Sequence, residues 1–238
     1  KEKGGLVFWS MTEARDFHEY KFGPLGTVTV KTEAHPESLV QTAGYTGFGG
    51  LYQDGRTIIK PGELWDRLLQ LSTDEQRPVP VLIGELAFHG LSDAGKDLHR
   101  LVTVFSVKER TIAGVLEALR SGHAYAVGEG DHHVQLRLDE FRVLCQGGTE
   151  SASVGDRLDP VGARDLMVRL SITASDRGRH PVKMRLIRSG QVGAQLAGET
   201  PFHVDWPDAT VPTKERMTYR VEITGSGELL SNPIFVGK

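Results

Sequence analysis

The chain has 238 residues and a net charge of −3, with Lys and Arg scattered among Asp and Glu, which argues against a surface for nucleic acid. Its length suits two domains, because domains usually hold about 100 to 150 residues. A single cysteine, Cys145, excludes an internal disulfide framework and a multi-cysteine zinc site, and no apolar run reaches the roughly 18 residues of a membrane span.

The chain opens with Lys1-Glu2-Lys3-Gly4-Gly5, without an initiator Met and without the apolar core of a signal peptide. We therefore expect a fragment or a processed product, and the compartment stays open. An incomplete fold exposes strand edges and apolar surface, which favours self-association or a missing N-terminal segment.

Strand and helix patterns alternate before residue 130. A short apolar strand is predicted over 5–10, and residues 12–20 are polar enough for a loop or a short helix. Residues 26–32 alternate as a strand does, and the glycine-rich stretch 44–52 suits a loop at a site or a tight packing corner. This alternation predicts α/β organisation for the first part of the chain.

Two helices are predicted in the same part. The first spans 61–71, with Pro61 in its first turn, and the second spans 111–121, with Thr111 as its cap and Gly122 at its end. Their apolar stripes are Leu64, Trp65, Leu68 and Leu69 in the first helix, and Ile112, Val115, Leu116 and Leu119 in the second. Both stripes are expected to face a core.

The stretch Val79 to Gly90 is the most informative for function, because an apolar strand runs into Glu, Ala and His. If the chain stays extended after Gly84, then Glu85, Ala87 and His89 share one face. A carboxylate and an imidazole on one face form a metal pair. The alternative for His89 is a hydrogen-bonded structural histidine at a strand end.

Other polar residues are weaker candidates. His18 is a candidate metal ligand or substrate contact, with a solvated loop residue as the alternative. Lys96, just after the metal stretch, is a candidate phosphate contact, against a polar surface turn. The adjacent His132 and His133 are expected to point to opposite faces and so not to share one ion. His99 has no supporting neighbours in the sequence.

After His132 the hydrophobic pattern changes to period two, with glycine-containing turns between the strands. About seven short strands in about 105 residues predict an all-β immunoglobulin-like sandwich. The strands are centred on Val134 to Phe141, Leu166 to Ile172, Val182 to Ile187, Phe202 to Trp206, Tyr219 to Ile223, and Leu229 to Val236.

Several segments together resemble the PHP-domain metal-dependent phosphoesterases. The likeness covers roughly residues 1–128 and extends to a β-sandwich that some of these proteins carry after the barrel. The segments are Leu6 to Ser10, Trp65 to Leu69, Gly84 to Gly90, Glu117 to Tyr125, Tyr219 to Glu222, and Leu230 to Val236. We therefore expect the C-terminal portion of a distorted β/α barrel over 1–129 and an Ig-like sandwich over 130–238.

The resemblance implies up to three divalent ions, manganese, iron or zinc, at the strand ends. It also implies hydrolysis of a small phosphorylated substrate by a metal-bound hydroxide. On this alignment His89 belongs to the last metal motif, and Glu85 is a substitute ligand displaced from the usual position by about 7 Å along the strand.

The sequence also departs from the family. No His-x-His pair occurs before residue 100, Met11 stands where a His is usual, and Ala87 stands where the last motif has Asp. A thioether and a methyl group do not bind the ions used in phosphate chemistry. We therefore expect a chain that is inactive or strongly impaired as a phosphoesterase.

The alternative comes from another class of protein. In it the chain is a non-catalytic binding or docking module, and the sandwich supplies the interaction. Trp206, between Asp205 and Pro207, is then a candidate for stacking on a sugar, although closing the sandwich core is the more common role of such a residue.

Overall fold

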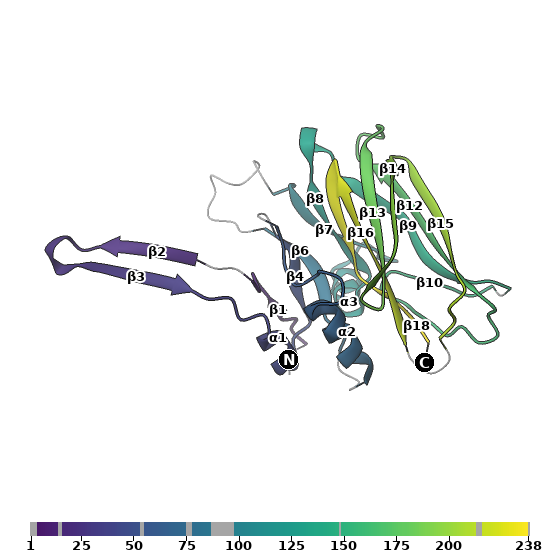
Figure 1. Cartoon of the computed structure of the whole chain (residues 1–238), viewed down its shortest axis with the longest axis horizontal. Helices are drawn as coiled ribbons and strands as arrows, with labels where there is room; N and C mark the ends of the chain where they lie inside the picture. Colours follow the sequence, from purple (N-terminus) through teal and green to yellow (C-terminus); the bar gives the residue numbers. More distant parts are fainter. Residues whose placement is uncertain are drawn as a thin grey trace.

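The computed structural model describes residues 4–13, 16–52, 55–74, 78–86, 98–147, 149–212 and 216–237. Strands dominate this part of the chain, and helices are few. The strands form an eight-stranded sheet, two four-stranded sheets and a separate hairpin (Figure 1). The protein is therefore mostly β.

Two sheets of largely antiparallel strands form the sandwich. The first contains, in spatial order, β10 (Ser151–Ser153), β9 (Leu136–Cys145), β12 (Leu166–Ala174) and β15 (Phe202–Asp208). The second runs β11 (Arg157–Leu158), β18 (Ile234–Val236), β16 (Met217–Gly225), β17 (Gly227–Ser231), β8 (Ala124–Glu129) and β7 (Leu101–Phe105). On its other edge β16 pairs with β13 (Pro181–Arg188), which pairs with β14 (Gln191–Glu199).

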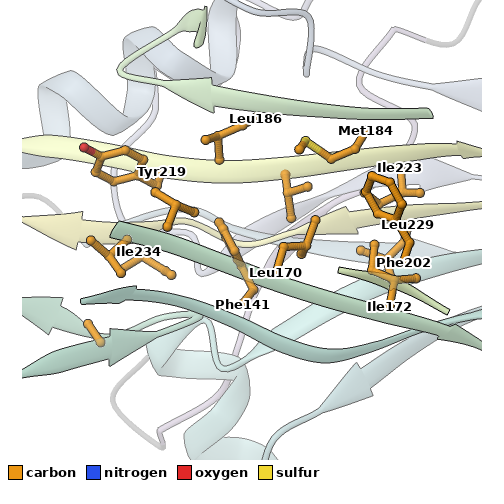
Figure 2. Packing of buried hydrophobic residues seen from close by; sticks show 14 of the residues in the cluster. Phe141, Leu170, Ile172, Met184, Leu186, Phe202, Tyr219, Ile223, Leu229 and Ile234 are labelled. Atoms are coloured by element: carbon orange, nitrogen blue, oxygen red, sulfur yellow. The ribbon is translucent and has the colours of Figure 1, made fainter. Parts of the chain in front are cut away.

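Apolar side chains alternate along these strands and meet between the two sheets (Figure 2). Leu170 and Ile172 come from the first sheet, and Tyr219 and Ile223 come from the second. Each large side chain removed from water contributes about 1.5–3 kcal/mol before the entropy cost of folding. The β-rich second half follows the predicted alternation.

A smaller sheet lies at the N-terminal side of the chain. Its strands β1 (Phe8–Trp9), β4 (Gly47–Tyr52) and β6 (Val81–Glu85) are parallel, and β5 (Gly55–Arg56) pairs antiparallel with β4. A short helix, α1 (Ser38–Gln41), precedes β4, and α2 (Leu64–Asp74) follows β5. The apolar stripe predicted for the helix over 61–71, which is α2, is confirmed, because all four of its side chains are buried.

The prediction of a loop or packing corner for residues 44–52 is wrong in part, because Gly47 to Tyr52 form the central strand β4. The glycines are there because neighbours approach too closely for a side chain. A Cβ on Gly47 would lie 2.0 Å from the Val81 carbonyl oxygen, and one on Gly50 would lie 2.4 Å from Leu82 Cδ1. Close approach of backbones is a common reason for glycine inside a strand.

Residues 16–32 form a hairpin that projects from the rest of the chain (Figure 1). It consists of β2 (Asp16–Lys21), a short 3₁₀ helix (Gly23–Leu25) and β3 (Thr27–Thr32). The loop or short helix predicted for 12–20 is therefore wrong for β2. The alternation predicted for 26–32 is confirmed, but Val28 and Val30 are exposed.

Helix α3 (Ile112–Ser121) is confirmed together with its two end signals. The Thr111 hydroxyl accepts a hydrogen bond from the Gly114 amide at 3.1 Å, and Gly122 is left-handed with φ of 79°. The predicted burial of its stripe is wrong for Ile112, which is 83% exposed. Within the described residues no helix has the length and apolarity needed to cross a bilayer.

The eight-stranded sheet also contacts the N-terminal part with its second face. Arg220 and Glu222 on β16 alternate with the side chains of the sandwich core but are still buried: Trp65 and Asp66 of α2 contact Arg220, and Arg220, Arg56 and Arg185 surround the Glu222 carboxylate. The Arg220 guanidinium lies 4.8 Å from the centroid of the Trp65 ring and donates to Asp66 at 2.8 Å and to Glu222 at 2.7 Å. A buried ion network therefore joins α2, in the N-terminal part of the chain, to strand β16 of the eight-stranded sheet.

Asn232 makes a second link, in the turn between β17 and β18. Its side-chain oxygen accepts from the Leu82 amide at 2.7 Å, and its side-chain nitrogen donates to the carbonyls of Leu82 and Ala124, each at 2.9 Å. The amide side chain thus takes the place of a neighbouring strand beside β6. The division predicted at residue 130 stays a prediction, while sheet hydrogen bonds between β8 and β17 cross it.

Candidate functional site at the carboxyl edge of the parallel strands

The carboxyl ends of β1, β4 and β6 lie at one edge of the small sheet, since the three strands run in the same direction. Glu85 ends β6 there. The hydroxyl of Ser10 donates to one oxygen of the Glu85 carboxylate, and the Met11 amide donates to the other at 3.3 Å. The residues that follow β1 therefore hold the carboxylate with hydrogen bonds.

Gly49 on β4 makes room for this carboxylate. A Cβ at residue 49 would lie 2.0 Å from Glu85 Oε2. Thr12, which follows Met11 in the chain, is buried, and its hydroxyl has no hydrogen-bond partner within the described residues. Met11 has a positive φ of 47°, which is uncommon for a residue other than glycine. The edge thus combines a fixed carboxylate with a constrained backbone.

Of the site residues expected from the sequence, Glu85 and His18 lie within the described residues. His89, Ala87 and Lys96 lie outside the described residues, so their predicted roles stay predictions. His18 lies on β2, and Figure 1 shows that this strand projects away from the parallel sheet. Its ring centroid is 6.2 Å from that of Tyr20 on the same hairpin, and its predicted role as a ligand stays a prediction.

A pocket of about 260 Å³ opens at the same edge. Its lining comes from both parts of the chain, with Tyr52 from β4, Leu86 from the end of β6, Glu129 from β8 and Glu228 from β17. Arg56 donates to the Glu228 carboxylate at 2.9 Å, which fixes one wall. The pocket therefore places acidic groups near the strand ends.

One residue that lines this pocket, Glu129, belongs to a cluster that the sequence reasoning missed. His99, Glu129 and His133 bring one ligand atom each to within 4.8 Å of one another. Glu129 Oε1 lies 3.2 Å from His133 Nδ1 and 3.7 Å from His99 Nε2. The four-residue spacing of Glu129 and His133 was the available signal, and His99 had none. His132 lies beside His133 in a 3₁₀ turn (Asp131–His133), not on a strand as the prediction assumed, and it is not one of the three residues of the cluster.

Another histidine lies between a serine and an aspartate. His123 Nδ1 is 3.1 Å from the Ser121 hydroxyl, and its Nε2 is 2.9 Å from Asp156. The Ser121 hydroxyl, however, donates to the Glu117 carbonyl in its own helix at 2.8 Å. Its proton is thus committed to the backbone. The arrangement fastens the end of α3 to the turn before β11 and is not set up as a nucleophile.

Trp206, the residue considered for sugar stacking, is half-buried on β15 and packs against the sandwich core. A Cβ on Gly193 of the outer strand β14 would lie 3.4 Å from the indole ring. The ring therefore covers β14 and does not present a free flat face. This placement supports the core-closing role.

No protein-family model matches this chain, and neither a curated protein nor a solved structure does.

Proposed function

We propose that this chain is a metal-dependent phosphoesterase of the PHP type whose hydrolytic site, at the carboxyl edge of β1, β4 and β6, is impaired. The observation that carries the proposal is the environment of Glu85. The carboxylate stands at the carboxyl ends of parallel strands, where β/α-barrel enzymes place their active-site residues, but Ser10 and Met11 donate hydrogen bonds to it.

The chemistry of these contacts explains the impairment. A metal ligand must offer a lone pair, whereas the Met11 amide and the Ser10 hydroxyl offer protons to the carboxylate. The two donors use part of the hydrogen-bonding capacity of the Glu85 carboxylate. An ion entering this position has to compete with both hydrogen bonds and finds no imidazole on residue 11.

The test is hydrolysis of bis(4-nitrophenyl) phosphate by the full chain with manganese in excess. We expect no turnover above that of manganese alone. Turnover that a chelator abolishes, and that Glu85→Gln lowers at least about tenfold, would show a working site and contradict the impairment. Glu63→Gln on the exposed surface serves as the matched control, because Glu63 lies outside this edge.

A further inference from the structure

We propose that His99, Glu129 and His133 form a zinc site that does not use Glu85 and is independent of the phosphoesterase proposal. The three residues come from the loop before β7, from the end of β8, and from the 3₁₀ turn that follows (Asp131–His133). Two imidazoles and one carboxylate are a donor set found in zinc enzymes.

The distances fit a small tetrahedral ion. Zinc bonds of about 2.1 Å set the ligand atoms of a tetrahedron about 3.4 Å apart. The two contacts to Glu129 Oε1 are 3.2 Å and 3.7 Å, and all three atoms lie within 4.8 Å. The third side, between the two imidazole nitrogens, has to close on binding, and the side chains that would move are the exposed His99 and His133, because Glu129 is held in the interior.

The carboxylate is the unusual member of the set. The Glu129 side chain is only 5% exposed, and within the described residues its carboxylate lies beside the two imidazoles. A buried carboxylate needs compensating charge or hydrogen bonds. Each imidazole nitrogen that faces the carboxylate offers at most one hydrogen bond, whereas a divalent ion would bind the carboxylate and both imidazoles at once. Burial of Glu129 therefore favours a cation between the three side chains.

The backbone is shaped to bring His133 to this position. Both His132 and His133 have positive φ, 58° and 62°, a conformation that is rare for residues other than glycine. The Gly130 amide donates to the Val134 carbonyl at 2.9 Å and closes the turn around them. A Cβ on Gly130 would lie 2.3 Å from backbone atoms of Ser226, so the turn is packed tightly against the next loop. Strain of this kind persists where its surroundings enforce it, often at functional sites.

The fourth position of the ion would face the pocket. Of the three proposed ligands, Glu129 lines the pocket together with Tyr52 and Glu228, so the ion would lie at the Glu129 side of the pocket. Three protein ligands with one open position are typical of sites that bind water or an exogenous ligand. We therefore expect an exchangeable water or a small anion at this position.

The test is calorimetric titration of the chelator-treated full chain with zinc chloride. The matched pair is His133→Asn and His132→Asn, since Asn tolerates positive φ and the two neighbours share one backbone conformation. We expect one zinc per chain for the wild type and for His132→Asn, and at least tenfold weaker binding for His133→Asn. Cobalt(II) should give the intense visible absorption of a tetrahedral complex, and only when His133 is present.

Three results would overturn the inference. These are the absence of zinc binding, equal affinity of the two Asn variants, and binding that survives His133→Asn but is lost in Glu85→Gln. Glu129→Gln adds a second check on the carboxylate. Far-ultraviolet circular dichroism of every variant separates a lost ligand from a lost fold.

Discussion

Gly49 and Glu85 show how one missing side chain positions another. The carboxylate occupies the space in which a Cβ at residue 49 would stand, and Ser10 and Met11 hold it there. Such a contact makes the glycine as important as the acid. The geometry at the candidate edge therefore depends on a residue that carries no chemistry of its own.

Gly49→Ala is expected to lower the free energy of unfolding by about 1–3 kcal/mol, because the new methyl group and the Glu85 side chain compete for the same space. Urea denaturation measures this loss. In a Glu85→Ala background the same substitution should cost clearly less, since the carboxylate oxygens are gone. Strictly additive losses in this double-mutant cycle would contradict the contact.

Tyr219 and Asp208 form a buried pair at one end of the sandwich, with the phenol donating to the carboxylate at 2.8 Å. Burial, and then the hydrogen bond to Asp208, raises the pKa of Tyr219 above its ordinary value. Burial alone would raise the pKa of Asp208, but hydrogen bonds from Arg188, Thr210 and Tyr219 together lower it. The folded state therefore favours a neutral phenol beside an ionised carboxylate.

The sign of the pH dependence follows for Tyr219. Its raised pKa stabilises the fold fully below the unfolded value of about 10, and this stabilisation is lost as the pH rises above that value toward the folded pKa. Tyr219→Phe should lower the free energy of unfolding at pH 7 by about 0.5–2 kcal/mol. It should also flatten the loss of stability between about pH 9 and pH 11. Denaturation curves at several pH values test this, and an unchanged alkaline slope would count against it.

At the scale of elements, the link from Asn232 to β6 is the most specific. The side chain is fully buried, and its three hydrogen bonds satisfy the amide of Leu82 and the carbonyls of Leu82 and Ala124. This contact gives a physical reason for the Asn in the segment Leu230 to Val236. It joins the end of the chain to the strand that carries Glu85.

Asn232→Ala is expected to lower the free energy of unfolding by about 3–5 kcal/mol, because it removes the side-chain partner of the buried Leu82 amide and carbonyl and leaves the Ala124 carbonyl only the backbone amide of residue 232, at 3.4 Å. Asn232→Asp keeps the shape but turns the nitrogen donor into an acceptor facing two carbonyls, so its loss should be at least as large. Guanidinium denaturation of both variants gives the comparison. Losses under about 1 kcal/mol in both would mean that water replaces the side chain.

The elements that the sequence predicts well are those with redundant local signals. Helix α3 has Thr111 as a cap and Gly122 as a stop, and the stripe of α2 has a core to face. Strand β14 escaped prediction because small residues such as Gly193 and Ala194 hide its alternation. Strand β2 escaped because its polar residues sit in a ribbon that is exposed on both faces.

The candidate site could be predicted only in part, for reasons of geometry. Glu85 follows a strand, so period two places it correctly at a strand end. The cluster of His99, Glu129 and His133 depends on two left-handed residues and on a contact across 30 positions of sequence, taken from 99 to 129. No periodicity encodes either feature. Exposure of Ile112 likewise depends on what packs on α3 from elsewhere.

At the scale of the whole molecule, the hairpin of β2 and β3 is the part with least support. Its pairing places His18 opposite Val30 and Tyr20 opposite Val28, so these four side chains share one face. Near its tip, Leu25 is 90% exposed. A two-stranded ribbon is marginally stable by itself in water, and an apolar face favours a partner.

We expect the chain to self-associate through this face, with the hairpins of two copies packed against each other. Replacing residues 18–30 by a short Gly-Ser linker should leave the melting temperature of the sandwich nearly unchanged and remove the concentration dependence of the molar mass. Light scattering after size exclusion measures this mass. Tyr20→Lys is a milder variant, and Glu19→Lys on the opposite face is its control. A molar mass that is unaffected by the linker would refute the prediction.

The hydrogen bonds between β8 and β17 have a consequence for how this protein could be inherited or rebuilt. A cut near residue 130 would separate strands that are neighbours in one sheet, leaving Leu229 and Val127 without their partners. Neither half could then be exchanged by recombination as a self-sufficient cassette. A segment that is exchanged by recombination has to include the strands from Leu101 onward. Its first residue therefore lies before residue 130, where the hydrophobic pattern of the sandwich begins.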